Sequence, residues 1–180
     1  MKKLFSLCVL CLSFNASAHV ESINNDWRTY GDYAQIAIPA AGYITAWLKG
    51  DSEGAWQLTK GLLITQGIAE VTKTVTDIDR PCGGHRSFPS GHTAAAFSGA
   101  SFMHHRYGWE YGLPAYLAAT GVAYSRVQAN KHWSTDVLAG AALAYTVSYF
   151  LTDKFEDPNL SVVPISMGKD AQGIAVNYRF

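Results

Sequence analysis

Five apolar segments with helical spacing run through most of this sequence and limit it to a helical fold. They cover roughly residues 33–48, 54–73, 91–105, 113–124 and 134–151. Alanines are frequent in them, and clusters of β-branched residues are few. Glycine-rich or polar breaks such as KGDSEG, DRPCGGHRS and RYGWEYG separate them. Because each segment must bury an apolar stripe against another, the sequence predicts an all-α bundle of about five core helices.

The first residues have a different character from the rest of the chain. In MKKLFSLCVLCLSFNASAHV, Lys2 and Lys3 precede an apolar run, and small residues follow at positions 16–18. This order is typical of a secretory signal peptide, so we predict residues 1–18 to be the signal, with cleavage after Ala18. An uncleaved anchor helix is the alternative, although the apolar run is shorter than the roughly 20 residues that span a bilayer.

Export would place the protein in the periplasm or at the periplasmic side of a membrane. Loss of Lys2 and Lys3 lowers the count of Lys and Arg from 14 to 12, against 14 Asp and Glu, a net charge of about −2. This balance gives no indication of a nucleic-acid partner. The longest uncharged stretch, residues 137–152, is shorter than a usual bilayer span. Together with a mean hydropathy of +0.00, it favours a soluble or surface-associated bundle over a membrane-embedded one.

The end of the chain changes its period. We expect the bundle to occupy residues 19–153 and a C-terminal extension to occupy residues 154–180. In the extension, GIAVNYRF alternates apolar and polar residues, and SVVPIS precedes it across GKDAQG. This pattern predicts a short β-hairpin, which we expect to pack on the bundle.

Three polar clusters interrupt the apolar chain. They are KTVTDIDRP at residues 73–81, PSGH at residues 89–92, and SRVQANKHWSTD at residues 125–136. In the first, Lys73 and Arg80 are seven residues apart, about two helical turns if the helix continues. In the third, His132 and Asp136 are four residues apart and would share one face of a helix start.

The second cluster, inside FPSGHTAAAF, predicts the start of a helix. Proline fits a helix entry, and the Ser90 hydroxyl can accept from amides of the first turn. His92 would then lie where free backbone N–H groups and the helix dipole favour an anion. Taken alone, the stretch is better explained by a simple helix cap and a surface histidine, and only its combination with the other clusters favours an anion site.

Antiparallel packing of neighbouring helices would bring the three clusters to one end of the bundle. His92, His132 and Asp136 are potential zinc ligands there. However, the nearby cations would repel a metal ion, whereas they suit a compact oxyanion such as phosphate. These cations are Lys73, Arg80 and Arg126. We therefore expect an anion site with no metal and no cofactor.

The three clusters resemble the three signature motifs of the type 2 phosphatidic acid phosphatase and vanadium haloperoxidase superfamily. The matching patterns are Lys73-x6-Arg80-Pro81, Pro89-Ser90-Gly91-His92 and Ser125-Arg126-x5-His132-x3-Asp136. The resemblance covers roughly residues 33–152. It implies a metal-independent phosphatase, a phosphoric monoester hydrolase of the bacterial exported kind.

The resemblance also implies a role for each motif residue. His132 would attack phosphorus and form a phosphohistidine, and Asp136 would hold the other nitrogen of its ring. His92 would protonate the leaving alkoxide. The phosphate oxygens would be bound by Lys73, Arg80, Ser90, Gly91 and Arg126. The remaining histidine and arginine of the intervening loop, His85 and Arg86, are expected to be solvated.

Several functions stay open at this point. The substrate would be a phosphorylated small molecule or a lipid, including lipid phosphates and prenyl pyrophosphates, with a membrane surface as a further partner. A vanadium-dependent haloperoxidase is an alternative enzyme, because vanadate resembles the phosphate transition state. A non-catalytic periplasmic phosphate-binding protein is a third hypothesis, although such a protein would gain little from two histidines and Asp136.

Overall fold

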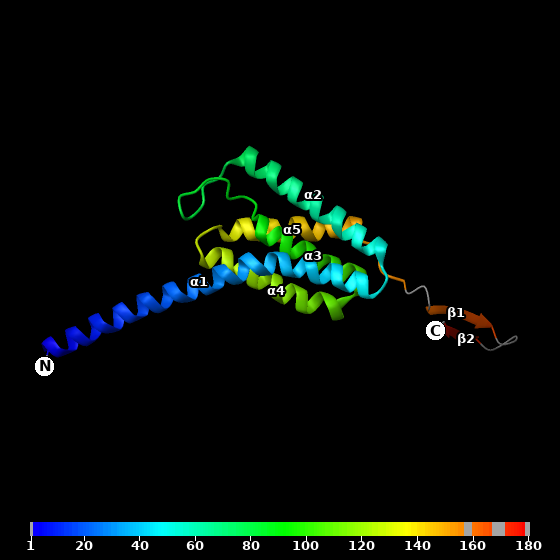
Figure 1. Cartoon of the computed structure of the whole chain (residues 1–180), viewed down its shortest axis with the longest axis horizontal. Coiled ribbons are helices and arrows are strands. Elements are labelled where there is room, and N and C mark those ends of the chain that lie inside the picture. Colours follow the sequence, from blue (N-terminus) through cyan, green and yellow to red (C-terminus); the bar gives the residue numbers. More distant parts are fainter. Residues whose placement is uncertain (1, 157–159, 167–171, 179–180) are drawn as a thin grey trace.

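The computed structural model describes residues 2–156, 160–166 and 172–178. Five helices are followed by two strands: α1 (Lys2–Leu48), α2 (Ser52–Thr76), α3 (Gly91–Tyr107), α4 (Trp109–Gln128), α5 (Ser134–Leu151), β1 (Leu160–Ser166) and β2 (Gln172–Tyr178). The helices run side by side in one bundle, with the N-terminal part of α1 projecting beyond it (Figure 1). The predicted helical bundle with a terminal hairpin is confirmed.

The central helix is α3, which contacts each of the other four helices. Ala94, Ala96 and Ala100 are completely buried on it. Gly99 lets α1 approach closely, because a Cβ placed there would lie 2.7 Å from the backbone nitrogen of Pro39. The alanine run after the PSGH cluster is therefore the close-packed centre of the bundle.

Side-chain caps define where two of the helices begin. Asp51 precedes α2 and accepts from the Gly54 amide at 2.8 Å. The same carboxylate receives two hydrogen bonds from the buried Arg106, at 2.6 and 2.7 Å, which ties α2 to the end of α3. Ser90 begins α3 as expected, with its hydroxyl accepting from the Thr93 amide at 3.4 Å.

Two helix boundaries differ from the sequence-based expectation. Helix α2 continues to Thr76, three residues beyond its expected end, and stops there because Asp77 adopts a left-handed conformation with φ of 40°; Arg80 therefore lies in the following loop. Helix α4 begins as early as Trp109, so the expected break RYGWEYG shrinks to Gly108, whose φ is 90°. In addition, α1 runs without interruption across the predicted cleavage site, and the signal peptide remains a prediction.

The two strands pair antiparallel, with Val163 opposite Ala175. The expectation that this hairpin packs on the bundle is wrong: in the described residues neither strand contacts a helix, and the hairpin stands beyond the bundle end (Figure 1). The chain stays on the bundle only as far as Phe155, whose amide donates to the Arg106 carbonyl at 2.8 Å. Apolar side chains of β2 such as Ile174 and Val176 are exposed as a result.

No helix in the described part of the chain has both the length and the hydropathy that crossing a membrane requires.

The close approach of α1 to α3 gives a first test. Gly99→Ala should lower the free energy of unfolding by about 2 kcal/mol, because its Cβ would press on rigid backbone at Pro39. Gly61→Ala is the matched control: it lies inside α2 with open space around its Cα, so alanine should leave stability unchanged or raise it by up to about 1 kcal/mol. Urea denaturation measures both, and equal effects would contradict the packing.

Candidate active site

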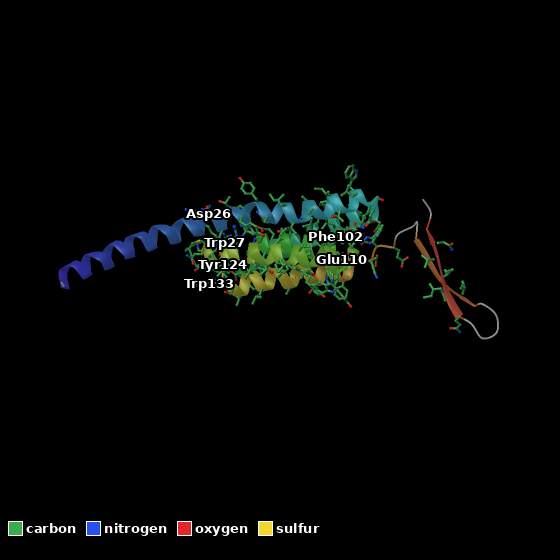
Figure 2. The ribbon with its side chains drawn as sticks, turned by 90° about the horizontal axis from the view of Figure 1, so that it is seen from below. Asp26, Trp27, Phe102, Glu110, Tyr124 and Trp133 are labelled. Atoms are coloured by element: carbon green, nitrogen blue, oxygen red, sulfur yellow. The ribbon has the colours of Figure 1, made fainter. Side chains whose placement is uncertain are left out.

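All three polar clusters lie at one end of the bundle, around the N-terminus of α3. Figure 2 shows Trp133, next to the start of α5, at the same end as Tyr124 of α4 and Trp27 of α1. The Ser90 amide donates to the Asp136 carbonyl at 2.9 Å, which joins the starts of α3 and α5 directly. Gly140 permits this contact, because a Cβ there would lie 2.6 Å from the Ser90 carbonyl oxygen.

The Asp136 carboxylate organises the start of α5. Its Oδ2 accepts from the Trp133 amide at 2.9 Å, which caps the helix, and also from the Ser87 hydroxyl. The same oxygen lies 3.5 Å from Nδ1 of His132. Ser87 adds a second contact to this nitrogen at 3.4 Å. His132 and Asp136 are both buried, so the imidazole is held in one orientation.

The environment of His132 favours its neutral form. Burial lowers the pKa of the imidazole first, and the positive charge of Arg80 lowers it further, against the opposing effect of Asp136. The resulting pKa is about 4. At neutral pH the ring therefore keeps an unprotonated nitrogen, which is the form that can act as a nucleophile or a base.

Lys73 comes from the last turn of α2 and reaches the N-terminus of α3. A Cβ on Gly91 would lie 2.9 Å from its Nζ, so the ammonium stands directly beside the first residue of that helix. The side chain of Gln66, also on α2, donates to the Gly91 carbonyl at 3.1 Å and so holds the start of α3 against α2. Burial lowers the pKa of Lys73, and the charges of Arg80 and Arg86 lower it further.

The guanidinium of Arg126 is buried between α4 and α1. Its Nη1 donates to Oδ1 of Asp32 at 2.7 Å, and its Nη2 donates to the Arg28 carbonyl at 2.7 Å. Nε donates to the Ser125 hydroxyl at 3.0 Å. Every nitrogen of the group is therefore bound, and its position is fixed by α1.

Asp32 also connects this arginine to His92. Its Oδ1 lies 3.3 Å from Nε2 of His92. Burial lowers the pKa of His92, and so does the charge of Arg126, while Asp32 opposes both. The three groups form one continuous polar contact from the end of α4 to the first turn of α3.

The loop between α2 and α3 completes the site. Arg80 Nε donates to the His85 carbonyl at 3.0 Å, which directs the guanidinium back over the loop. Trp133 Nε1 donates to the Asp79 carbonyl at 2.9 Å and ties the loop to α5. His85 is exposed, as expected of a solvated residue. Arg86 is instead bound to Glu70 of α2.

The geometry suits an anion better than a metal ion. In the described residues no group of three or more His, Cys, Asp or Glu side chains is close enough to hold a metal. The charges of Arg126 and Lys73 act on His92, and the charge of Arg80 acts on His132, so three cations lie near the N-terminus of α3. Such a set neutralises the oxygens of a phosphate group.

Sequence reasoning missed three residues that the structure brings to the site. Asp32 and Arg28 belong to α1, and Ser87 lies between two of the polar clusters. Nothing in their local sequence sets them apart from a surface ion pair or a loop serine. The neighbouring Gly31, a glycine inside a helical segment, is the sequence feature that could have drawn attention to this region. The structure gives its reason, because a side chain at this position would collide with Ser125 and Arg126.

Residues 54–159 match the model of the PAP2 superfamily. The chain belongs to this superfamily. The match begins after α1, so the residues that α1 supplies lie outside it. The family and the relatives described next make the chain a phosphatase, a phosphoric monoester hydrolase.

Two curated relatives of this PAP2 protein are lipid A phosphatases. The lipid A 4'-phosphatase of Helicobacter pylori is 29% identical over an alignment of 199 positions, gaps included, which spans all of this chain and all of that protein. The lipid A 1-phosphatase of Porphyromonas gingivalis is 34% identical over 138 residues, 69% of this chain and 30% of that protein. Both names favour phosphate ester hydrolysis over the haloperoxidase and the non-catalytic hypotheses.

A solved structure shares the fold of this PAP2 protein. The crystal structure of Aquifex aeolicus LpxE superposes with a TM-score of 0.62 at 22% identity. The comparison covers 71% of this chain and 84% of that chain. The helical arrangement is therefore one that the two proteins have in common.

The depressed pKa of His132 can be tested by NMR titration. We expect its imidazole to stay neutral down to about pH 4, well below the ordinary histidine value of about 6.5. Arg80→Met should raise this pKa, because it removes the second largest cause of the depression. A pKa near 6.5 for His132 in the wild-type protein that does not change in Arg80→Met would contradict the described environment.

Proposed function

We propose that this PAP2 protein removes a phosphate group from a phosphorylated lipid, through a phosphohistidine on His132. The observation that carries the proposal is the neutral, buried His132, held by Asp136 and close enough to the positive charge of Arg80 for its pKa to be lowered. A neutral imidazole beside a site for a phosphate anion is what in-line attack on phosphorus needs.

His132 supplies the nucleophile in this mechanism. Its Nδ1 faces Asp136 and Ser87, so this nitrogen carries the proton and Nε2 keeps its lone pair. Nε2 attacks phosphorus, the P–N bond forms, and the bond from phosphorus to the leaving oxygen breaks. Asp136 stabilises the positive charge that develops on the ring, as an orienting carboxylate does in other triads.

His92 handles the proton of the leaving group. It donates a proton to the departing alkoxide, and it then accepts one from the water that attacks the phosphohistidine. That attack breaks the P–N bond and releases inorganic phosphate. Asp32 supports this role, because its contact with Nε2 orients the ring and raises the pKa of His92 against the lowering by burial and by the charge of Arg126.

The phosphate oxygens are held by backbone and side-chain donors together. Lys73 lies at the start of α3, Gly91 offers a free amide of the first turn, and Ser90 contributes its hydroxyl. Arg80 and Arg126 supply further positive charge, one from the loop and one from the end of α4. Charge that spreads over the oxygens in the transition state is thereby neutralised without a metal.

A lipid phosphate is the proposed substrate class, with lipid A as the substrate that both curated relatives name. The surface supports a membrane partner, because large apolar side chains are exposed along several helices. They include Ile36 and Trp47 of α1, Leu63, Val71 and Val75 of α2, and Phe150 of α5. We place the enzyme at the periplasmic side of a membrane, reached through the predicted signal peptide.

Replacement of His132 tests the proposed nucleophile. His132→Ala should reduce kcat for p-nitrophenyl phosphate and for a lipid phosphate in detergent by at least about 10³-fold. His85→Ala, an exposed histidine of the neighbouring loop, should retain wild-type kcat. Rapid quenching should trap an acid-labile phosphoenzyme in the control and none in His132→Ala. Unchanged hydrolysis by His132→Ala would overturn the mechanism, and activity on soluble esters alone would overturn the lipid substrate.

The acid role of His92 predicts a dependence on the leaving group. His92→Ala should lower kcat for a simple alkyl phosphate by about 10²-fold or more, because a poor leaving group needs the proton. Release of p-nitrophenol, which leaves readily as the anion, should be affected much less. A plot of log kcat against leaving-group pKa measures the difference, and equal losses for both substrates would count against this role.

A further inference from the structure

An apolar groove lies between α1 and α4. It is a cavity of about 600 Å³ lined by Asp26, Trp27 and Tyr30 of α1 and by Leu117 and Gly121 of α4. Its size falls within the range of small-molecule sites in proteins, and its lining is mainly apolar and aromatic. None of these five residues belongs to the three polar clusters.

The walls of the groove are held in place by contacts within the chain. Tyr30 donates its hydroxyl to the Ala118 carbonyl at 2.9 Å. Trp27 packs edge-on against Tyr30 and against Tyr124, with ring centroids 5.8 and 5.0 Å apart. Gly121 leaves room for the Tyr30 ring, because a Cβ there would lie 2.8 Å from Cε1 of this tyrosine. The groove is therefore preformed, and an apolar ligand would pay little to order it.

The groove and the proposed phosphate site share one short segment of α1, less than two turns long. Trp27 and Tyr30 line the groove, whereas the Arg28 carbonyl and the Asp32 carboxylate bind Arg126. On α4 the groove and the proposed phosphate site are also adjacent, because Tyr124 contacts Trp27 and is followed in the sequence by Ser125 and Arg126. The labels of Trp27, Tyr124 and Trp133 fall together at this end of the bundle (Figure 2).

The direction of the groove follows from the helix that lines it. Leu117 and Arg126 are nine residues apart on α4, about 14 Å at the rise of an α-helix. A ligand with its phosphate at Arg126 could therefore lay an apolar tail along α4 toward Leu117. Leu117 is 69% exposed at the far end and has apolar surface available for such a tail.

We propose that the groove between α1 and α4 binds an acyl chain of the phosphorylated lipid whose phosphate occupies the active site. This inference rests on the proposed lipid phosphatase function and locates its substrate specificity. A hydrocarbon chain fits the groove because its aromatic walls can bury methylene groups. Asp26 also lines the groove, and its negative charge makes the groove unsuited to a phosphate group.

The test uses p-nitrophenyl phosphate as reporter and n-alkylphosphonates as non-hydrolysable competitors, from butyl to decyl, below their micelle concentrations. In the wild-type protein the inhibition constant should fall by at least about tenfold from butyl to decyl, because each buried methylene strengthens binding. Leu117→Lys should flatten this dependence and leave kcat and KM for p-nitrophenyl phosphate within about twofold, since Leu117 does not contact the catalytic residues.

Leu63→Lys is the matched control. Leu63 is 67% exposed, close to the value for Leu117, and it lies on α2, which does not contact α4 in the described residues. This variant should keep the wild-type dependence on chain length. Leu117→Ser, which adds no charge, should weaken the dependence without abolishing it. Thermal melts of the three variants should agree with that of the wild type.

The outcomes test the groove proposal separately from the proposed phosphatase function. No hydrolysis of p-nitrophenyl phosphate or of any lipid phosphate would refute the proposed function itself. Hydrolysis with inhibition constants that do not change with chain length would leave the phosphatase standing and refute the groove. Equal loss of chain-length dependence in Leu117→Lys and Leu63→Lys would assign the apolar binding to the general surface, and would refute the groove as well.

Discussion

The packing of small residues on α3 is the constraint on which the rest of the structure depends. Ala94, Ala96 and Ala100 leave no exposed surface, and Gly99 meets the backbone of α1 at Pro39. Only side chains of this size allow four helices to surround a fifth at contact distance. Since the N-terminus of α3 lies at the centre of the polar clusters, this packing also sets how closely the cations and histidines approach one another.

The proposed mechanism places two opposite electrostatic demands on the site. A phosphate anion needs positive charge around it, but a nucleophilic histidine must stay unprotonated. The structure satisfies both with the same groups, because the charge of Arg80 that would attract a phosphate also helps to lower the pKa of His132. Asp136 acts in the other direction on the pKa, yet it holds the ring in place together with Ser87. The site is therefore preorganised for an anion and a neutral base at once.

Helix α1 has a larger part in the site than its sequence suggests. It lies outside the residues that match the superfamily, but it supplies Asp32 and the Arg28 carbonyl to the buried Arg126. The same short segment of α1 supplies Trp27 and Tyr30 to the apolar groove. This segment of α1 thus connects the proposed phosphate site to the proposed acyl-chain groove, and such additions to a shared fold are where members of a superfamily can differ in specificity.

The sequence by itself determined the helical class, the hairpin and the identity of the polar clusters. Helical spacing, the breaks between helices and the Ser90 cap depend on neighbouring residues only, so they can be predicted from the sequence. It left open whether the helix continues from Lys73 to Arg80, and the left-handed turn at Asp77 decides this by ending α2 before Arg80. It also placed the hairpin on the bundle, where the described strands make no contact.

Only the tertiary structure decided how the site is assembled. Ser87 reaches Asp136 from 49 residues away, and Asp32 reaches Arg126 from 94 residues away. The low pKa of His132 likewise arises from burial and from Arg80, neither of which can be derived from the neighbours of His132 in the chain. Sequence spacing reports which residues share a helix face, whereas contacts between helices depend on how closely the helices pack, and here α3 sets that distance.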